Sequence, residues 1–398
     1  MFRWHAPATG GLDTPPWPGR PGTTSDPNPA RIPVKIESIE TLVREPVAVV
    51  RVRTDDGVEG IGQTAPYAAE MTSQVLHSMV ARFFLGRDPW DVETLVENCL
   101  ATYYKFPSTF LYRALAGLDT AVWDILGRVT GQPVSKLLGG HVRDSTPVYA
   151  SSMRRDIGPD EEADRLLGHI ETDGFEAVKI RVGSAMGRDG DVAPRRTERI
   201  IARVRDKLGE NIAISADANG GFSAARAIRV GRMLEDYAYH HFEEPCPYSQ
   251  LEQTAQVAAA LDIAVSGGEQ DNSLSQFNRM IAGRVVDIVQ PDIGYLGGIS
   301  RARKVAVLAE AAGIPCTPHC ANDSLLQVFT LHLAVAMPAC SQAQEWSIEE
   351  TPWSQGIYHP LPTVVDGRVA APTGPGWGVG LDPDFVATAE HRVSRLKA

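Results

Sequence analysis

The sequence has few cysteines, no long apolar run and a deficit of positive charge. Its five cysteines in 398 residues are odd in number and scattered, which favours reduced thiols over a disulfide framework. No apolar run approaches a membrane-spanning length, and the N-terminus lacks the pattern of a signal peptide. With 38 basic against 49 acidic residues, the net charge of −11 argues against nucleic acid or an anionic membrane as a partner. These absences predict a cytoplasmic protein.

The length and the apolar content of 43% predict one large domain and one smaller domain. Residues 1–30 are rich in Pro, Gly and Thr, so we interpret them as a disordered arm. Trp4 and Trp17 leave open that the arm packs on a neighbouring subunit. We expect a homo-oligomer, but the sequence does not set the number of subunits.

Residues 31–143 have the pattern of an α+β capping domain. Alternating segments at 35–43, 47–53 and 58–63, with a turn at Asp56-Gly57, predict an antiparallel meander. Helical periods follow over 67–100 and 110–126, and the second ends near Gly127 and Gly131. Residues 361–398 form a C-terminal segment, in which Pro375–Val379 resembles a strand that returns to the capping domain in related proteins.

Residues 144–360 alternate short apolar strands with helical stretches, which predicts an α/β fold of the (β/α)8 barrel type. In such a barrel the chemistry lies at the carboxyl ends of the strands. The eight expected strands are Pro147–Ser151, Ala177–Val182, Ile212–Asp217, His240–Glu244, Ile263–Gly267, Val286–Pro291, Ile314–Pro318 and Ala343–Trp346.

Three acids, Asp217, Glu243 and Glu269, stand at the ends of successive expected strands and recur at intervals of 26 residues. If they converge in a barrel mouth they would repel one another unless a hard divalent cation joined them, and Mg²⁺ is the simplest choice. Alternation places Asn219 on the side of Asp217, as a contact to the site or the substrate. Glu244 is expected to face away from Glu243 for the same reason.

The remaining polar strand ends indicate an acid/base site. Lys179 and Arg181 share a face and need negative charge inside a barrel, which a substrate carboxylate would supply. Asp292 and His319 form a plausible proton-transfer dyad, and the eighth strand carries Glu345. The other nine histidines have no comparable setting. A zinc site at Cys316, His319 and Cys320 is disfavoured because a second ligand pair is missing.

Seven motifs carry a family resemblance. In order they are AVKIR, SADANGG, HFEEP, SGGEQ, VQPDIGYLGGIS, TPHC and QEW, and they follow the α+β capping region. Together they resemble the mandelate racemase subgroup of the enolase superfamily, over roughly residues 34–385. The correct order and spacing of seven motifs make this a far more specific signal than any single one.

The resemblance implies one Mg²⁺ held by Asp217, Glu243 and Glu269. It implies removal of the proton α to a carboxylate, giving an enediolate that the metal stabilises. It also gives roles to further residues: His319 with Asp292 becomes an acid/base arm, while Glu345 and Lys179 lie beside the substrate carboxylate.

Arg181 departs from the subgroup, whose name-giving members have a lysine base there. A guanidinium stays protonated, so Arg181 can position negative charge but is a poor base. Dehydration needs only His319, alone or with Lys179, so we expect an acid-sugar dehydratase, a lyase acting on an aldonate or aldarate. Racemisation, epimerisation or lactone cycloisomerisation is the alternative. A Schiff-base aldolase using Lys179 and a non-catalytic binding barrel remain more distant.

Overall fold

The structure is a computed structural model that describes residues 34–396. The expected arm at residues 1–30 lies outside the described residues. Among the described residues, no helix combines the length and the apolar character needed to span a membrane. All five cysteines are free and buried, which confirms the prediction of reduced thiols.

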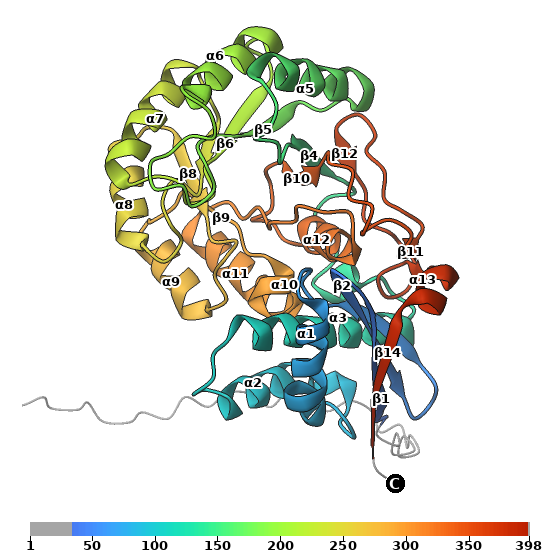
Figure 1. Cartoon of the computed structure of the whole chain (residues 1–398). Coiled ribbons are helices and arrows are strands. Elements are labelled where there is room, and N and C mark those ends of the chain that lie inside the picture. Colours follow the sequence, from blue (N-terminus) through green and yellow to red (C-terminus); the bar gives the residue numbers. More distant parts are fainter. Residues whose placement is uncertain (1–33, 397–398) are drawn as a thin grey trace, which may run out of the picture. The chain divides into compact units, whose positions relative to one another are not determined.

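The capping region is built on a four-stranded antiparallel sheet. Strands β1 (Ile36–Arg44), β2 (Val47–Thr54) and β3 (Glu59–Gln63) form the expected meander, and β14 (Glu390–Arg395) pairs with β1 (Figure 1). The strand that returns from the C-terminus is therefore β14, and the prediction of a strand at residues 375–379 is wrong. Those residues form a loop in which Trp377 is buried, and its Nε1 donates to the Ile61 and Thr120 carbonyls.

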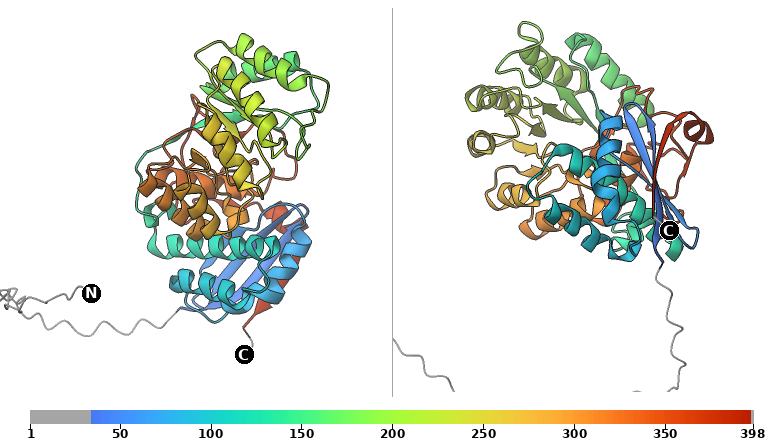
Figure 2. Two further views of the ribbon diagram at one scale, coloured as in Figure 1. Left: turned by 90° about the vertical axis from the view of Figure 1, so that its left-hand side faces the viewer. Right: turned by 60° about the horizontal axis from the view of Figure 1, so that its bottom comes forward.

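The helix α3 (Thr109–Thr130) separates the capping sheet from the barrel, as Figure 2 shows in teal. Ser108 caps its first turn by accepting from the Leu111 N–H, and Gly131 ends it with a φ of +65°. Strand β3 approaches so closely that a Cβ at Gly62 would collide with the backbone of α3. The shorter elements of this region are α1 (Ala69–Val75), a π-turn (Leu76–Val80), 3-10 turns (Ala81–Phe83 and Pro89–Asp91), α2 (Val92–Thr102) and α4 (Val134–Leu137).

A curved parallel sheet of seven strands forms the second region. Its order is β10-β4-β5-β6-β7-β8-β9, so strands that follow one another in sequence are neighbours, and the last strand returns beside the first. The strands are β4 (Thr146–Ser151), β5 (Ala177–Arg181), β6 (Ala213–Asp217), β7 (His241–Glu243), β8 (Ala264–Gly267), β9 (Ile288–Val289) and β10 (Gln344–Ser347).

The expected seventh barrel strand, at residues 314–318, does not form a continuous ladder. It lies beside β9, where Thr317 N–H donates to Val289 O at 2.9 Å and Val289 N–H donates to Pro315 O at 3.0 Å. Pro315 and Pro318 have no N–H, so the segment cannot extend this pairing. Two isolated bridges, Val289 with Cys316 and Asp292 with His319, nevertheless keep the two segments adjacent.

Helices cover the outside of the curved sheet, coloured green to orange in Figures 1 and 2. The helix α12 is buried on every side, which explains its apolar sequence. The helices are α5 (Pro159–Asp173), α6 (Arg196–Leu208), α7 (Ala224–Asp236), α8 (Leu251–Ala260), α9 (Leu274–Ala282), α10 (Ile293–Leu296), α11 (Ile299–Ala312) and α12 (Leu325–Ala336). After β10 come β11 (Tyr358–His359), β12 (Arg368–Val369), β13 (Gly380–Leu381) and α13 (Pro383–Thr388).

Candidate functional site

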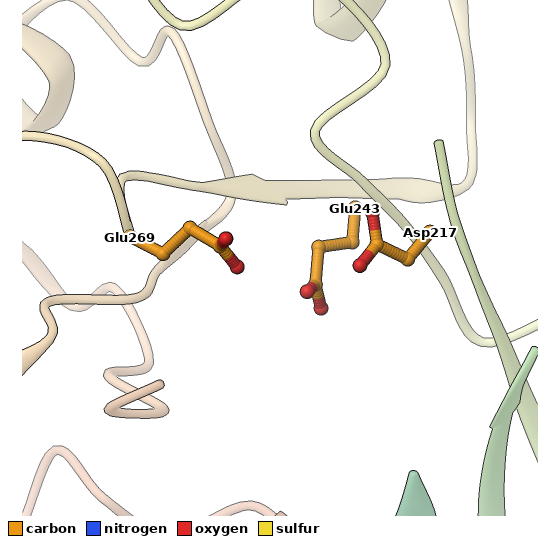
Figure 3. Close-up of side chains that lie close together, drawn as sticks. All are labelled: Asp217, Glu243 and Glu269. Atoms are coloured by element: carbon orange, nitrogen blue, oxygen red, sulfur yellow. The ribbon is translucent and has the colours of Figure 1, made fainter. Parts of the chain in front are cut away.

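Three carboxylates converge at the carboxyl ends of neighbouring strands. Asp217 ends β6 and is paired in register with Glu243, which ends β7, while Glu269 lies two residues beyond β8. All three are buried, and one oxygen from each lies within 4.8 Å of the others (Figure 3). Three like charges this close are stable only with compensating positive charge.

The donor set fits a hard divalent cation. All three side chains offer oxygen, and carboxylate oxygens are the ligands that Mg²⁺ prefers. The structure therefore brings together the predicted acids in a group that could hold one metal ion. By contrast, Cys320 Sγ donates to Asn322 O and His319 binds a carboxylate, so these residues form no thiolate–imidazole set.

Lys179 supplies positive charge to this group from β5. Its Nζ lies 2.5 Å from Glu243 Oε1 and 2.9 Å from Glu345 Oε1. Burial disfavours the ammonium form, but the two carboxylates outweigh it and raise the lysine pKa above its usual range. Lys179 is thus a buried cation shared by two acids.

Arg181, two residues further along β5, is held in a similar way. Its Nη1 contacts Asp217 Oδ2, and its Nε donates to Ser152 O at 2.9 Å. Asn219 is positioned as predicted, because its backbone N–H donates to Asp217 Oδ1 at 2.7 Å and its Oδ1 accepts from Arg181 at 3.1 Å. Arg155 also donates to Asn219 Oδ1, at 2.9 Å.

His319 contacts three carboxylates, including one of the clustered acids. Its Nδ1 lies 2.8 Å from Asp292 Oδ2, and its Nε2 lies 3.4 Å from Glu269 Oε2 and 3.6 Å from Glu345 Oε2. Burial disfavours the imidazolium, but Glu269, Glu345 and Asp292 together raise the pKa of His319 to about 10. Asp292 fixes Nδ1, so Nε2 is the nitrogen directed at the site.

Glu345 completes the group from β10. Ser151 Oγ donates to its Oε1 at 2.7 Å, and the Cys320 N–H donates to its Oε2 at 3.1 Å. Burial would raise its pKa, but Lys179 and His319 lower it to about 2. Glu345 is therefore an ionised acceptor in this arrangement.

Three residues at the site were missed from the sequence. Ser151 binds Glu345, and Gln290 Nε2 donates to Glu243 Oε2 at 2.8 Å. The expectation that His241 has no site setting is wrong, because its Nε2 lies 3.6 Å from Glu243 Oε2. The available signal was the two-residue period: Gln290 precedes Asp292 by two positions, and His241 precedes Glu243 by two.

Glu244 shows where the alternation of the strand ends. Its φ of +40° takes it out of the extended conformation, directly after β7. Burial and the neighbouring Glu269 and Glu243 raise its pKa well above the usual value, so it lies close to the acids it was expected to face away from. It is not part of the group of three whose oxygens meet.

Comparison with known families identifies this arrangement. Residues 161–385 match the family described as "Enolase C-terminal domain-like", and residues 22–139 match "Mandelate racemase / muconate lactonizing enzyme, N-terminal domain". The chain belongs to the enolase superfamily. The match of both parts also shows that it is a relative of the mandelate racemase group, as the seven motifs implied.

Characterised relatives in the superfamily act on acid sugars or their lactones. A D-galactonate dehydratase from Ralstonia pickettii is 30% identical over 349 residues, covering 85% of this chain and 89% of that protein. A D-galactarolactone cycloisomerase from Agrobacterium fabrum is 29% identical over 357 residues, covering 87% and 91%.

Solved structures in the superfamily have the same fold. A candidate racemase from Roseobacter denitrificans is 46% identical with a TM-score of 0.89, covering 91% of this chain and 100% of that one. A mandelate racemase/muconate lactonizing protein from Paracoccus denitrificans, complexed with magnesium, is 31% identical with a TM-score of 0.82, covering 91% and 99%. This protein is therefore an enzyme of the enolase superfamily with a buried triad of acids.

Proposed function

We propose that the protein is a Mg²⁺-dependent acid-sugar dehydratase that converts an aldonate or aldarate to a 2-keto-3-deoxy acid. The observation that carries this proposal is the placement of one imidazole, His319, 3.4 Å from Glu269 in the group of three carboxylates, while Lys179 is paired with two acids. In such a site the His319 imidazole can accept and donate a proton, and the other charged side chains keep their charge. Dehydration needs no second base.

His319 is the proposed base and acid. Its Nε2 takes the proton from the carbon α to the substrate carboxylate, while Asp292 holds Nδ1 and stabilises the imidazolium that forms. The same nitrogen then returns the proton to the departing β-hydroxyl, which leaves as water. The resulting enol converts to the 2-keto acid, so atoms and charge balance without another reactant.

The fixed charges would bind the substrate and offset the charge that develops on it. Asp217, Glu243 and Glu269 would hold the Mg²⁺, which when bound supplies positive charge beside the substrate carboxylate. Lys179 adds a second positive charge on the same side. His319 Nε2 lies 3.4 Å from Glu269 and 3.6 Å from Glu345. A cation bound to Glu269 would weaken the hold of this carboxylate on the imidazole proton and free Nε2 to act as a base.

Cycloisomerisation of a sugar lactone is the second candidate. It also needs a single base, and the relative from Agrobacterium fabrum is named for such a reaction. Racemisation is less well supported, because a second base would have to be Lys179, whose ammonium lies between Glu243 and Glu345. The same pairing opposes a Schiff base, which requires the free amine.

A screen of acid sugars tests the proposal. Purified enzyme with Mg²⁺ is incubated with mono- and diacid sugars and their lactones, and 2-keto-3-deoxy acids are detected as semicarbazones. We expect at least one Mg²⁺-dependent keto product. A keto product formed from a lactone, with none formed from the open-chain acids, would favour cycloisomerisation. Configurational change alone would overturn the dehydratase proposal.

A further inference from the structure

We propose that His241 is a positioning residue that holds Glu243 in the orientation in which it binds the metal ion. This inference rests on the proposed metal site but not on the choice of reaction. It concerns a buried histidine two residues before a proposed metal ligand.

Strand β7 places His241 beside Glu243. His241 and Glu243 are two residues apart in β7, so their side chains point to the same face. His241 is 4% exposed, and its Nε2 lies 3.6 Å from Glu243 Oε2. Within residues 34–396 this buried nitrogen has no hydrogen-bond partner. A buried polar atom without a partner is costly, so a small approach of the carboxylate would satisfy it.

The carboxylate beside Nε2 favours the tautomer that can donate to Glu243. Ser215 Oγ lies 2.9 Å from Nδ1, and His240 Nδ1 lies 3.1 Å from it. A hydroxyl can donate to Nδ1 or accept from it, so this neighbour is compatible with a ring proton on Nε2. The opposite tautomer would present a lone pair to the carboxylate of Glu243.

The donors around Glu243 differ in charge. Lys179 lies 2.5 Å from Oε1, and Gln290 Nε2 lies 2.8 Å from Oε2. A dication bound to this carboxylate would repel the lysine ammonium, whereas the Gln290 amide carries no charge. Gln290 and His241 are therefore the donors that can keep Glu243 oriented once a metal ion is bound. Such support commonly changes metal affinity by 10–100-fold.

The competing interpretation is a core histidine that only packs and binds Ser215. That role would affect stability but leave metal affinity unchanged. His332 is a suitable comparison, because it is also fully buried but lies between Ser135 N and Trp377 O, away from the triad.

The test measures metal affinity by calorimetry with Mg²⁺ and Mn²⁺ on the full-length protein. His241→Phe removes the donor with similar volume, His241→Gln places an amide near Nε2, and Ser215→Ala removes only the contact to Nδ1. We expect affinity to fall about 10-fold or more in His241→Phe, less in Ser215→Ala, and to recover largely in His241→Gln. His332→Phe should bind metal like the wild type.

The metal affinities of these variants test different parts of the inference. Wild-type affinity in His241→Phe would overturn the inference. Equal losses in His241→Phe and His332→Phe would also overturn it, since general loosening would then be the cause. If His241→Phe does not fold, the other two variants decide. Wild-type metal affinity in Ser215→Ala, together with equal metal affinities of His241→Gln and Ser215→Ala, would then overturn the inference. Failure of the wild type to bind either ion would instead remove the proposed metal site.

Discussion

Lys179 Nζ lies 2.5 Å from Glu243 Oε1, and neither side chain has any exposed surface. A buried ion pair adds little net stability by itself, but removing one partner leaves the other charge uncompensated. Glu345 shares the same ammonium at 2.9 Å. The lysine therefore takes part in the charge balance of the proposed metal site.

Replacing this lysine should make stability depend strongly on the metal. We expect Lys179→Met to lower the free energy of unfolding by about 3–5 kcal/mol without Mg²⁺, because two carboxylates lose their cation. Added Mg²⁺ should restore more stability to this variant than to the wild type. Urea titrations with and without Mg²⁺ measure both effects. Lys304→Met, which removes a partly exposed pair with Glu93, should change stability by less than about 1 kcal/mol.

Removing the proposed base should stop the reaction without removing the metal. We expect His319→Asn to lower kcat by about 10²–10⁴-fold, the usual contribution of a positioned acid/base group. Asp292→Asn should have a smaller effect, since Nδ1 keeps a partner of similar shape. Calorimetry should show Mg²⁺ binding by both variants. Turnover by His319→Asn at the wild-type rate would remove this residue from the mechanism.

Removal of the metal should abolish activity and lower the thermal midpoint of unfolding. Three clustered carboxylates repel one another without a cation, and a ligand present at about 100 times its Kd stabilises the folded state by about 2.7 kcal/mol. EDTA should therefore reduce both activity and melting temperature, and excess Mg²⁺ should restore them. Glu269→Gln should lose the Mg²⁺-dependent rise in melting temperature. A variant that kept the full rise would show that the ion binds elsewhere.

Stability should fall in mild acid because of buried histidines such as His332. Burial lowers the pKa of His332 to about 4, while the unfolded chain takes up the proton near pH 6.5. Above pH 6.5 the ring is neutral in both states and its contribution is complete. Between pH 6.5 and 4 only the unfolded state is protonated, so the free energy of unfolding falls by about 3 kcal/mol. Denaturant titrations of His332→Gln should show a shallower slope in this range.

Much of this site could be predicted because strand ends in a barrel meet at one face. Three acids at equal spacing sufficed to place Asp217, Glu243 and Glu269 together, and Asp292 with His319 followed from the next two strands. The carboxylates that pair with the buried side chain of Lys179 could not be predicted in the same way. Lys179 was expected to need negative charge inside the barrel, but the sequence did not show that its side chain reaches Glu243 and Glu345.

Predictions from the local sequence were also wrong where the backbone departs from the regular alternation of a strand. The prolines at 315 and 318 prevent a full seventh strand, although the apolar pattern is present. Glu244 leaves the strand alternation because of its positive φ. His241 was dismissed because it begins a strand, whereas in a strand as short as β7 its side chain still reaches Glu243.

Crystallographic anomalous scattering from Mn²⁺ tests the central claim most directly. In crystals grown with Mn²⁺, we predict one strong anomalous peak bonded to oxygens of Asp217, Glu243 and Glu269, with His319 Nε2 facing it across the site. A fully Mn²⁺-loaded crystal with no peak at these carboxylates, or with a peak that excludes one of the three, would contradict the account.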